Sequence, residues 1–332
     1  MIKAIYSLTG EKVYTQYDSN EIINLLNTTK PKLIWIDIHL ESHELSQNET
    51  HLLTEIFKFH EMSIEDCLFP QYFPKAEEFE DYIFGAIHGI QLKPNFLNEF
   101  EDSIYELNFF TGKGFLITVH IEDLFFLETL FEKTKSRPQV EFKHIERVLY
   151  NIFNKVVSSY EFTLEKIDDK VEDLEDEILE DPETENMEQI LDLKKAVFAF
   201  RKISESQQVA YAYFTRARNN FISKEYLVYF RDTYLQCVRT SQSIVMRSQM
   251  VVSLLEVYMS NVTVRLTEAM KVLTIIATVL MPVLIISGYF GMNVEFPEYK
   301  VFGKVGAWFF AVGLMLAAII SLLIYFKKKK WF

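Results

Sequence analysis

The chain has 332 residues and a formal net charge of -13, and 49% of its residues are hydrophobic while 24% are charged. So many charged residues exclude a protein built mostly of membrane spans, and the length leaves room for a soluble domain with its own core. The acidic balance suits cations and disfavours nucleic acid as a partner, because phosphate binding needs clustered lysine and arginine side chains.

Residues 1–140 are predicted to form a mixed α+β domain in the cytoplasm. Their start has too short an apolar run for a signal peptide. Runs of β-branched and aromatic residues predict strands at 33–40 and 82–92 and a hairpin over 103–121, and helices are expected at 43–60, 63–68 and 123–135. Ser63, with Asp66 three residues later, resembles a capping box and predicts a helix that begins there.

Long helices are predicted from residue 141 onward. The region 141–222 should hold two antiparallel helices, separated near Pro182, which is expected at the start of the second. The region 223–293 reads as one stalk helix that continues into a first membrane span at about 271–290. At about 1.5 Å per residue this helix would be close to 100 Å long. A helix of that length is expected to bundle with copies of itself.

Two charge-free segments end the chain, and each is long enough to cross a lipid bilayer roughly 30 Å thick. The first follows Lys271, the second covers 305–326, and an external loop at 294–304 is expected between them. The basic tail 327–332 should be cytoplasmic by the positive-inside rule, which places both termini inside the plasma (inner) membrane. The chain's cysteines, Cys67 and Cys237, are then expected as free thiols.

One face of the first span carries small and flexible residues at heptad-like intervals. They are Met270, Thr274, Ala277, Met281, Leu284 and Gly288. Such spacing is typical of ordinary helix packing, and it is equally what a pore-lining face would show in a symmetric ring of helices. Spacing alone leaves both readings open.

The segment MKVLTIIATVLMP, followed by GYFGMN, resembles the CorA family of divalent-cation (Mg²⁺/Co²⁺) transport proteins, in which Gly-Met-Asn closes the first of two C-terminal spans. The terminal YFKKKKW is similar to the basic collar of this family. The resemblance implies a homopentameric funnel, with five first spans around the ion path, second spans outside them and large cytoplasmic domains. Phe290 stands where the family usually has tyrosine.

The resemblance also implies roles for individual residues. Ion entry and selectivity would belong to Gly291, Met292 and Asn293, since a ring of amide oxygens can accept hydrogen bonds from a hydrated Mg²⁺ ion. The pore and gate would be lined by Met270, Leu273, Thr274, Ala277, Met281, Leu284 and Gly288. Thr267 and Leu284 replace more polar family residues, which makes the expected pore drier. The collar would be Lys327, Lys328, Lys329 and Lys330.

Regulation by internal Mg²⁺ is a further implication of the resemblance. Glu65 and Asp66 of one subunit would hold the ion together with Asp232 of the next, while Asn154 and Gln236 are neutral at positions that can be ligands in the family. Read without the resemblance, these carboxylates are ordinary surface or capping residues. His39 and His43 stand four residues apart on a strand-like stretch, where a metal site is not expected.

Three alternatives remain beside an Mg²⁺ channel that tolerates Co²⁺ or Ni²⁺. One is a Zn²⁺ transporter of the same superfamily, similar to ZntB, and another is a membrane-anchored scaffold or sensor. An enzyme is the least expected class, because the sequence has no phosphate-binding loop, no HExxH motif and no sign of an organic cofactor.

Overall fold

The computed structural model describes the chain with a few gaps. It leaves out Glu11, Pro70, Tyr72, Asn95, residues 181–183 and 217–220, Asn293, Glu295, Phe296 and Phe332, and the side chains of Thr184, Tyr299, Phe302 and Lys304. The chain divides into two compact units, Met1–Leu255 and Glu256–Phe332, and each is described by itself.

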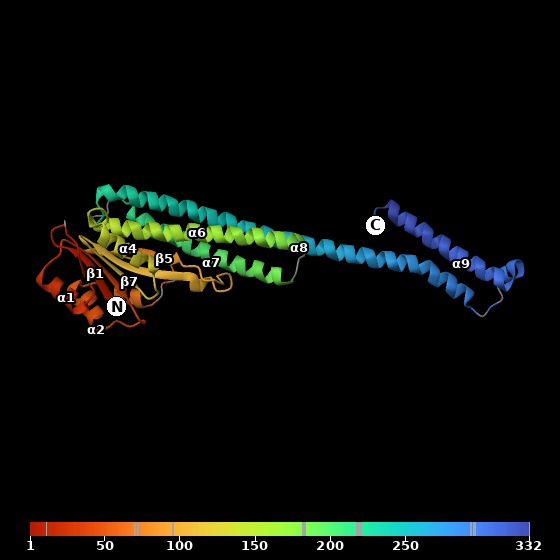
Figure 1. The fold of residues 1–332 in the computed structure, drawn as a ribbon, viewed down its shortest axis with the longest axis horizontal. Coiled ribbons are helices and arrows are strands. Elements are labelled where there is room, and N and C mark those ends of the chain that lie inside the picture. Colours follow the sequence, from red (N-terminus) through yellow and green to blue (C-terminus); the bar gives the residue numbers. More distant parts are fainter. Residues whose placement is uncertain are drawn as a thin grey trace. The chain divides into compact units, whose positions relative to one another are not determined.

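The first unit contains a seven-stranded sheet (Figure 1). Its strands are β1 (Ile2–Ser7), β2 (Tyr14–Gln16), β3 (Leu33–His39), β4 (Lys75–Glu78), β5 (Tyr82–Ile90), β6 (Ile104–Gly112) and β7 (Phe115–His120). They lie in the order β2-β1-β3-β7-β6-β5-β4. The β3–β7 pair is parallel and the other neighbouring pairs are antiparallel. The predicted strands and the β6–β7 hairpin are confirmed, whereas β1, β2 and β4 were not predicted.

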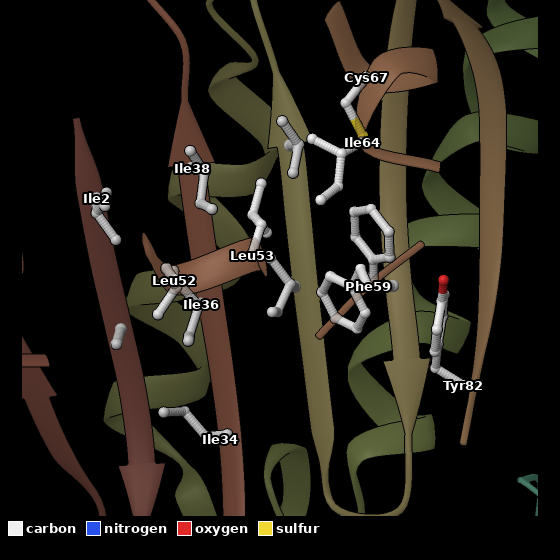
Figure 2. Close-up of a cluster of buried hydrophobic side chains, with 14 of the residues drawn as sticks. Ile2, Ile34, Ile36, Ile38, Leu52, Leu53, Phe59, Ile64, Cys67 and Tyr82 are labelled. Carbon is white, nitrogen blue, oxygen red and sulfur yellow. The ribbon is translucent and has the colours of Figure 1, made fainter. Parts of the chain in front are cut away.

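One face of the sheet packs against short helical segments. These are α1 (Ser19–Thr28), α2 (Gln47–Thr50), the π-helical turn η1 (His51–Ile56) and α3 (Glu61–Leu68). Because side chains alternate along a strand, Ile34, Ile36 and Ile38 all point into this layer. Figure 2 shows them beside Leu53 and Phe59, in a core where the ring centroids of Phe59 and Phe110 are 4.0 Å apart.

The opposite face is covered by longer helices, α4 (Phe125–Ser136), α6 (Ile145–Glu180) and α7 (Thr184–Phe214). The short α5 (Pro138–Glu141) follows α4. Phe109 of β6 packs edge-on against Phe153 of α6, with centroids 5.6 Å apart. Where β5 extends beyond the short strand β4, side chains from the helices form hydrogen bonds with its unpaired backbone groups. Gln207 Oε1 accepts from the backbone N–H of His88 at 3.1 Å, and the Tyr160 hydroxyl donates to the carbonyl of His88 at 2.7 Å.

The predicted capping box at Ser63 is wrong. Helix α3 begins at Glu61, and the ring of His60 caps it by accepting from the backbone N–H of Met62 at 3.2 Å. Ser63 is therefore already inside the helix, where it is buried. A capping box does occur ahead of α2, where Ser46 and Glu49 exchange both hydrogen bonds. The helix predicted over 43–60 is shorter, since helical structure begins at residue 47 and ends at 56.

The three long helices predicted from the sequence are confirmed as α6, α7 and α8 (Lys224–Phe290), the last with 67 residues and Pro282 inside it. Pro182 lies outside the described residues. The last helix, α9 (Pro297–Lys328), is interrupted at Gly303, whose φ of 67° and ψ of 169° are not helical. Residues 297–302 are therefore helical within the predicted loop, and the second apolar segment begins after Gly303. A 3-10 turn, η2 (Glu101–Ser103), precedes β6.

Candidate ion path and regulatory site

Among the described residues, two helices are long and apolar enough to cross a membrane, Lys224–Phe290 and Val305–Lys328. Only 6% and 11% of their most apolar windows are buried, so they are not core helices of a soluble domain. Apolar surface of this extent is unfavourable in water and favourable in a hydrocarbon layer, where a helix satisfies its own backbone groups. The second unit therefore fits a two-span membrane protein.

The heptad-like face of α8 is exposed along its whole length. This exposed seam consists of Met270, Leu273, Thr274, Ala277, Met281, Leu284 and Gly288. The buried or half-buried residues of the same segment form a different face, made of Ile275, Thr278, Val279, Pro282, Val283 and Ile286. At 3.6 residues per turn the two faces are centred roughly 180° apart. The rest of the chain thus covers one side of this helix and leaves the seam exposed, together with neighbouring residues such as Val272, Ile276, Leu280 and Ile285.

The Gly-Met-Asn segment begins where α8 ends. The backbone N–H of Gly291 donates to the carbonyl of Ser287 at 2.9 Å, and that of Met292 donates to the carbonyl of Tyr289 at 3.3 Å. A Cβ atom at Gly291 would lie 2.9 Å from the Ser287 carbonyl oxygen, a distance that side chains do not tolerate. The turn therefore requires glycine because of this close approach. Met292 is exposed, and Asn293 lies outside the described residues.

The basic tail follows α9 directly. The four lysines, Lys327, Lys328, Lys329 and Lys330, are all exposed. Trp331 stacks on Phe326 with ring centroids 5.4 Å apart, which holds the end of the chain against the helix. The lysines are thus available to charged headgroups or to other chains.

The three carboxylates predicted to bind regulatory Mg²⁺ all lie in the first unit. Glu65 on α3 and Asp232 on α8 are exposed, whereas Asp66 is partly buried. Asp66 is already engaged, since Lys75 Nζ lies 2.5 Å from its Oδ2 atom and Gln71 Nε2 donates to its Oδ1 atom at 3.0 Å. Carboxylate oxygens are suitable ligands for Mg²⁺.

A complete divalent-cation site is not formed within one chain. Across the part of the chain that the structure describes, three or more His, Cys, Asp or Glu side chains do not converge in a metal-binding arrangement. The ring nitrogens of His39 and His43 instead lie 2.9 Å and 2.6 Å from backbone carbonyl oxygens. The carboxylates of Glu65, Asp66 and Asp232 therefore suit Mg²⁺ in chemistry, and the described residues of one chain do not bring them together.

Two polar contacts join α6 to the part of α8 that follows Asp232. Gln236, which is neutral where the family can have a ligand, donates to Glu161 at 2.9 Å. Arg247 makes a two-pronged contact with Asp168, at 2.9 Å and 2.7 Å. The Asp168 carboxylate on α6 is thus neutralised within the chain.

A buried charged network at the carboxyl ends of β3 and β7 was not predicted. Asp37 accepts from the Thr118 hydroxyl at 2.5 Å, and its carboxylate lies 3.2 Å from Lys3 Nζ and 3.5 Å from His120 Nε2. The Trp35 indole N–H donates to the same hydroxyl at 3.1 Å. The one available signal was an aspartate in the middle of the apolar strand LIWIDIH.

Opposing effects set the pKa values in this network. Burial alone would raise the pKa of Asp37, but the hydrogen bond and charge of His120, with Lys3 and Thr118, outweigh burial and lower it. Burial alone would lower the pKa of His120, but the hydrogen bond and charge of Asp37 outweigh burial and raise it. Each partner thus favours the charged form of the other.

Comparison with known proteins agrees with the two-span architecture. The family described as "CorA-like Mg2+ transporter protein" matches residues 30–328. The chain is 30% identical to the cobalt/magnesium transport protein CorA of Thermotoga maritima, over 98% of this chain and 90% of that protein.

Two solved structures share the fold at lower identity. The complete CorA magnesium transporter of Methanocaldococcus jannaschii has a TM-score of 0.83 and 21% identity, covering 100% of this chain and 99% of that one. The ZntB cytoplasmic domain of Vibrio parahaemolyticus has a TM-score of 0.62 and 11% identity, over 78% of this chain and 96% of that one. With the family match over almost its whole length, this chain belongs to the CorA family of Mg²⁺ transporter proteins.

Proposed function

We propose that the protein is a channel-type transporter of divalent cations, chiefly Mg²⁺ with Co²⁺ or Ni²⁺ tolerated. The observation that carries the proposal is the exposed seam of α8, which lies opposite the covered face of the helix and leads to the Gly-Met-Asn turn. In a ring of copies this seam would face the axis. A homopentamer is the assembly implied by the family.

The seam offers mostly apolar side chains, with one hydroxyl at Thr274 and little that could hold a bare ion. Apolar rings formed by Met270, Leu273 and Met281 would gate the path by excluding water. At the outer end, five Asn293 amides would accept hydrogen bonds from the water shell of the ion, which Mg²⁺ gives up reluctantly. The protein would lie in the inner membrane with both termini in the cytoplasm. An inside-negative membrane potential of 100 mV would then favour entry of a divalent ion by roughly 4.6 kcal/mol.

Closure would depend on the regulatory carboxylates. Asp66 of one chain and Asp232 of its neighbour repel each other when they are close, unless a cation lies between them. Glu65, which is also on α3, would add a third carboxylate to this site. A divalent ion held there would stabilise the closed ring, and its loss would free the subunits to move.

Mg²⁺ flux into proteoliposomes tests the proposal. We expect Asn293→Ala to abolish Mg²⁺ transport, and Asp232→Ala to keep transport while weakening its inhibition by Mg²⁺ on the cytoplasmic side. Asn24→Ala, which removes an exposed amide on α1, is the matched control and should behave as the wild type. Normal flux in Asn293→Ala would contradict the proposed ion entry.

A Zn²⁺ transporter is the second candidate, favoured by the fold shared with the ZntB cytoplasmic domain. Zinc flux coupled to protons, without Mg²⁺ flux, would establish it in place of the first. A membrane-anchored scaffold or sensor would move neither ion, and it would leave an Mg²⁺-uptake-deficient strain without rescue.

A further inference from the structure

Both oxygens of the Asp66 carboxylate are occupied by donors from its own chain. Lys75 Nζ lies 2.5 Å from Oδ2, and Gln71 Nε2 donates to Oδ1 at 3.0 Å. The side chains of Asp66 and Lys75 are 22% and 27% exposed, so solvent screens this pair only in part. A cation of this chain therefore already stands where a regulatory ion would bind.

The structure holds these donors in place. The backbone N–H of Gln71 donates to Glu106 Oε2 at 2.6 Å. Lys75 belongs to strand β4, and its ammonium lies 5.5 Å from the centre of the Phe84 ring. The same ammonium is 3.3 Å from Glu77 Oε1, so a second carboxylate can keep it neutralised if Asp66 is taken by another cation.

We infer that Lys75 competes with the regulatory divalent cation for Asp66 and so sets the internal Mg²⁺ concentration at which the protein closes. This inference rests on the proposed role of Asp66 in regulation. A divalent ion at Asp66 must displace the ammonium or share the carboxylate with it, and two cations a few ångströms apart repel each other. Either way, the apparent affinity for the ion is lower than that of an unpaired carboxylate.

Lys75 also affects the state without bound metal. By neutralising Asp66, it reduces the repulsion that Asp66 would exert on Asp232 of a neighbouring chain. Removing the ammonium should therefore strengthen metal binding and weaken the closed ring without metal. Both effects make closure more dependent on Mg²⁺.

The test is the full-length protein with Lys75→Gln, and with Lys75→Met, which keeps the apolar stem beside Phe84. The first readout is protection against chymotrypsin as Mg²⁺ is added, because this protease does not depend on the lysine that is removed. We expect half-protection at an Mg²⁺ concentration roughly fivefold below that of the wild type. This change corresponds to about 1 kcal/mol, the upper end for surface ion pairs, because solvent screens this pair only in part. Half-inhibition of flux should shift by the same factor.

Two control variants separate the local pair from general charge effects. Lys195→Gln removes the same charge from another lysine–aspartate pair of the first unit, where Lys195 Nζ lies 2.8 Å from Asp192, and it should leave half-protection unchanged. Lys75→Arg keeps the cation and should stay near the wild type. An equal shift in Lys195→Gln would overturn the inference.

Asp66→Asn distinguishes the inference from the function on which it rests. If Asp66→Asn weakens Mg²⁺ protection while neither Lys75→Gln nor Lys75→Met lowers the half-protecting concentration, the competition is refuted and the regulatory site stands. If Asp66→Asn leaves protection unchanged, the regulatory role of Asp66 fails, and the inference fails with it.

Discussion

Replacing Asp37 by asparagine should destabilise the first unit strongly. The carboxylate is 1% exposed and faces His120 and Lys3, so the variant leaves two cations near a neutral amide. Removing one partner of a buried ion pair typically costs about 3–5 kcal/mol. The low end, about 3 kcal/mol, applies here because the amide can still accept from Thr118 and because Lys3 also lies 3.9 Å from Glu128. For a unit of this size the loss corresponds to a fall in Tm of roughly 6–12 °C.

The effect should depend on pH in a defined direction. The pKa of His120 is raised above its ordinary value of 6.5 by Asp37. The stability from this pair is therefore fully present below that value and is lost as pH rises through the folded pKa. Asp37 stays charged over this range, because its own pKa is lowered from 3.8. Without Asp37, burial disfavours charged His120. The difference in Tm between the wild type and Asp37→Asn should therefore be largest at about pH 6 and shrink toward pH 9.

Tryptophan fluorescence during heating measures this change. Trp35 is buried and hydrogen-bonds to the hydroxyl that contacts Asp37, and a Trp308→Phe, Trp331→Phe background leaves it as the one tryptophan. Asp123→Asn is the control, because Asp123 is 97% exposed. If the Tm of Asp37→Asn lies equally far below that of the wild type at both pH values, the charge pairing of Asp37 with His120 is refuted. If the Tm of Asp37→Asn is unchanged, the contribution of Asp37 to stability is refuted.

Two further predictions concern the turn and the long helices. Gly291→Ala should reduce Mg²⁺ flux by about tenfold, since its Cβ would lie 2.9 Å from the Ser287 carbonyl oxygen and misplace the turn. Gly313→Ala, whose Cβ meets nothing within 4 Å, should keep normal flux; equal losses in the two variants would argue against the close approach. Arg247→Lys should lower stability by about 1 kcal/mol in thermal unfolding, because lysine cannot reproduce the two-pronged contact with Asp168. An unchanged Tm would mean that this contact adds nothing.

The long helices and the buried strands could be predicted because their signals are local. Residues 141–179 have apolar side chains at helical spacing and lack glycine and proline, and α6 follows. The strands β3, β5, β6 and β7 are apolar runs bounded by turns. Strand β4, with the sequence KAEE, gives no such signal, since it is four residues long and lies at the edge of the sheet, where polar residues are favoured.

The features that could not be predicted depend on contacts between distant segments. Asp37 and Thr118 are 81 residues apart, and only the parallel pairing of β3 with β7 brings them together. The start of α3 was misplaced because His60, rather than a serine, caps it. Asp66 and Lys75 are only nine residues apart, yet they lie on different elements, α3 and β4, which the fold must bring together. The resemblance therefore points to Asp66 as a ligand without revealing its ion pair with Lys75.

The residues proposed for the ion path and for the regulatory site lie on one chain, but the part that the structure describes completes neither. The seam of α8 is exposed, and the described carboxylates do not converge on a metal. The proposed path and regulatory site would therefore take surfaces from more than one chain, as the proposed homopentamer provides. Asp232 and the seam also belong to the same helix, α8. If Asp66 of one chain moves relative to Asp232 of its neighbour, the movement would act on α8, the helix that would line the ion path. Lys75, which pairs with Asp66, would influence how readily this movement occurs.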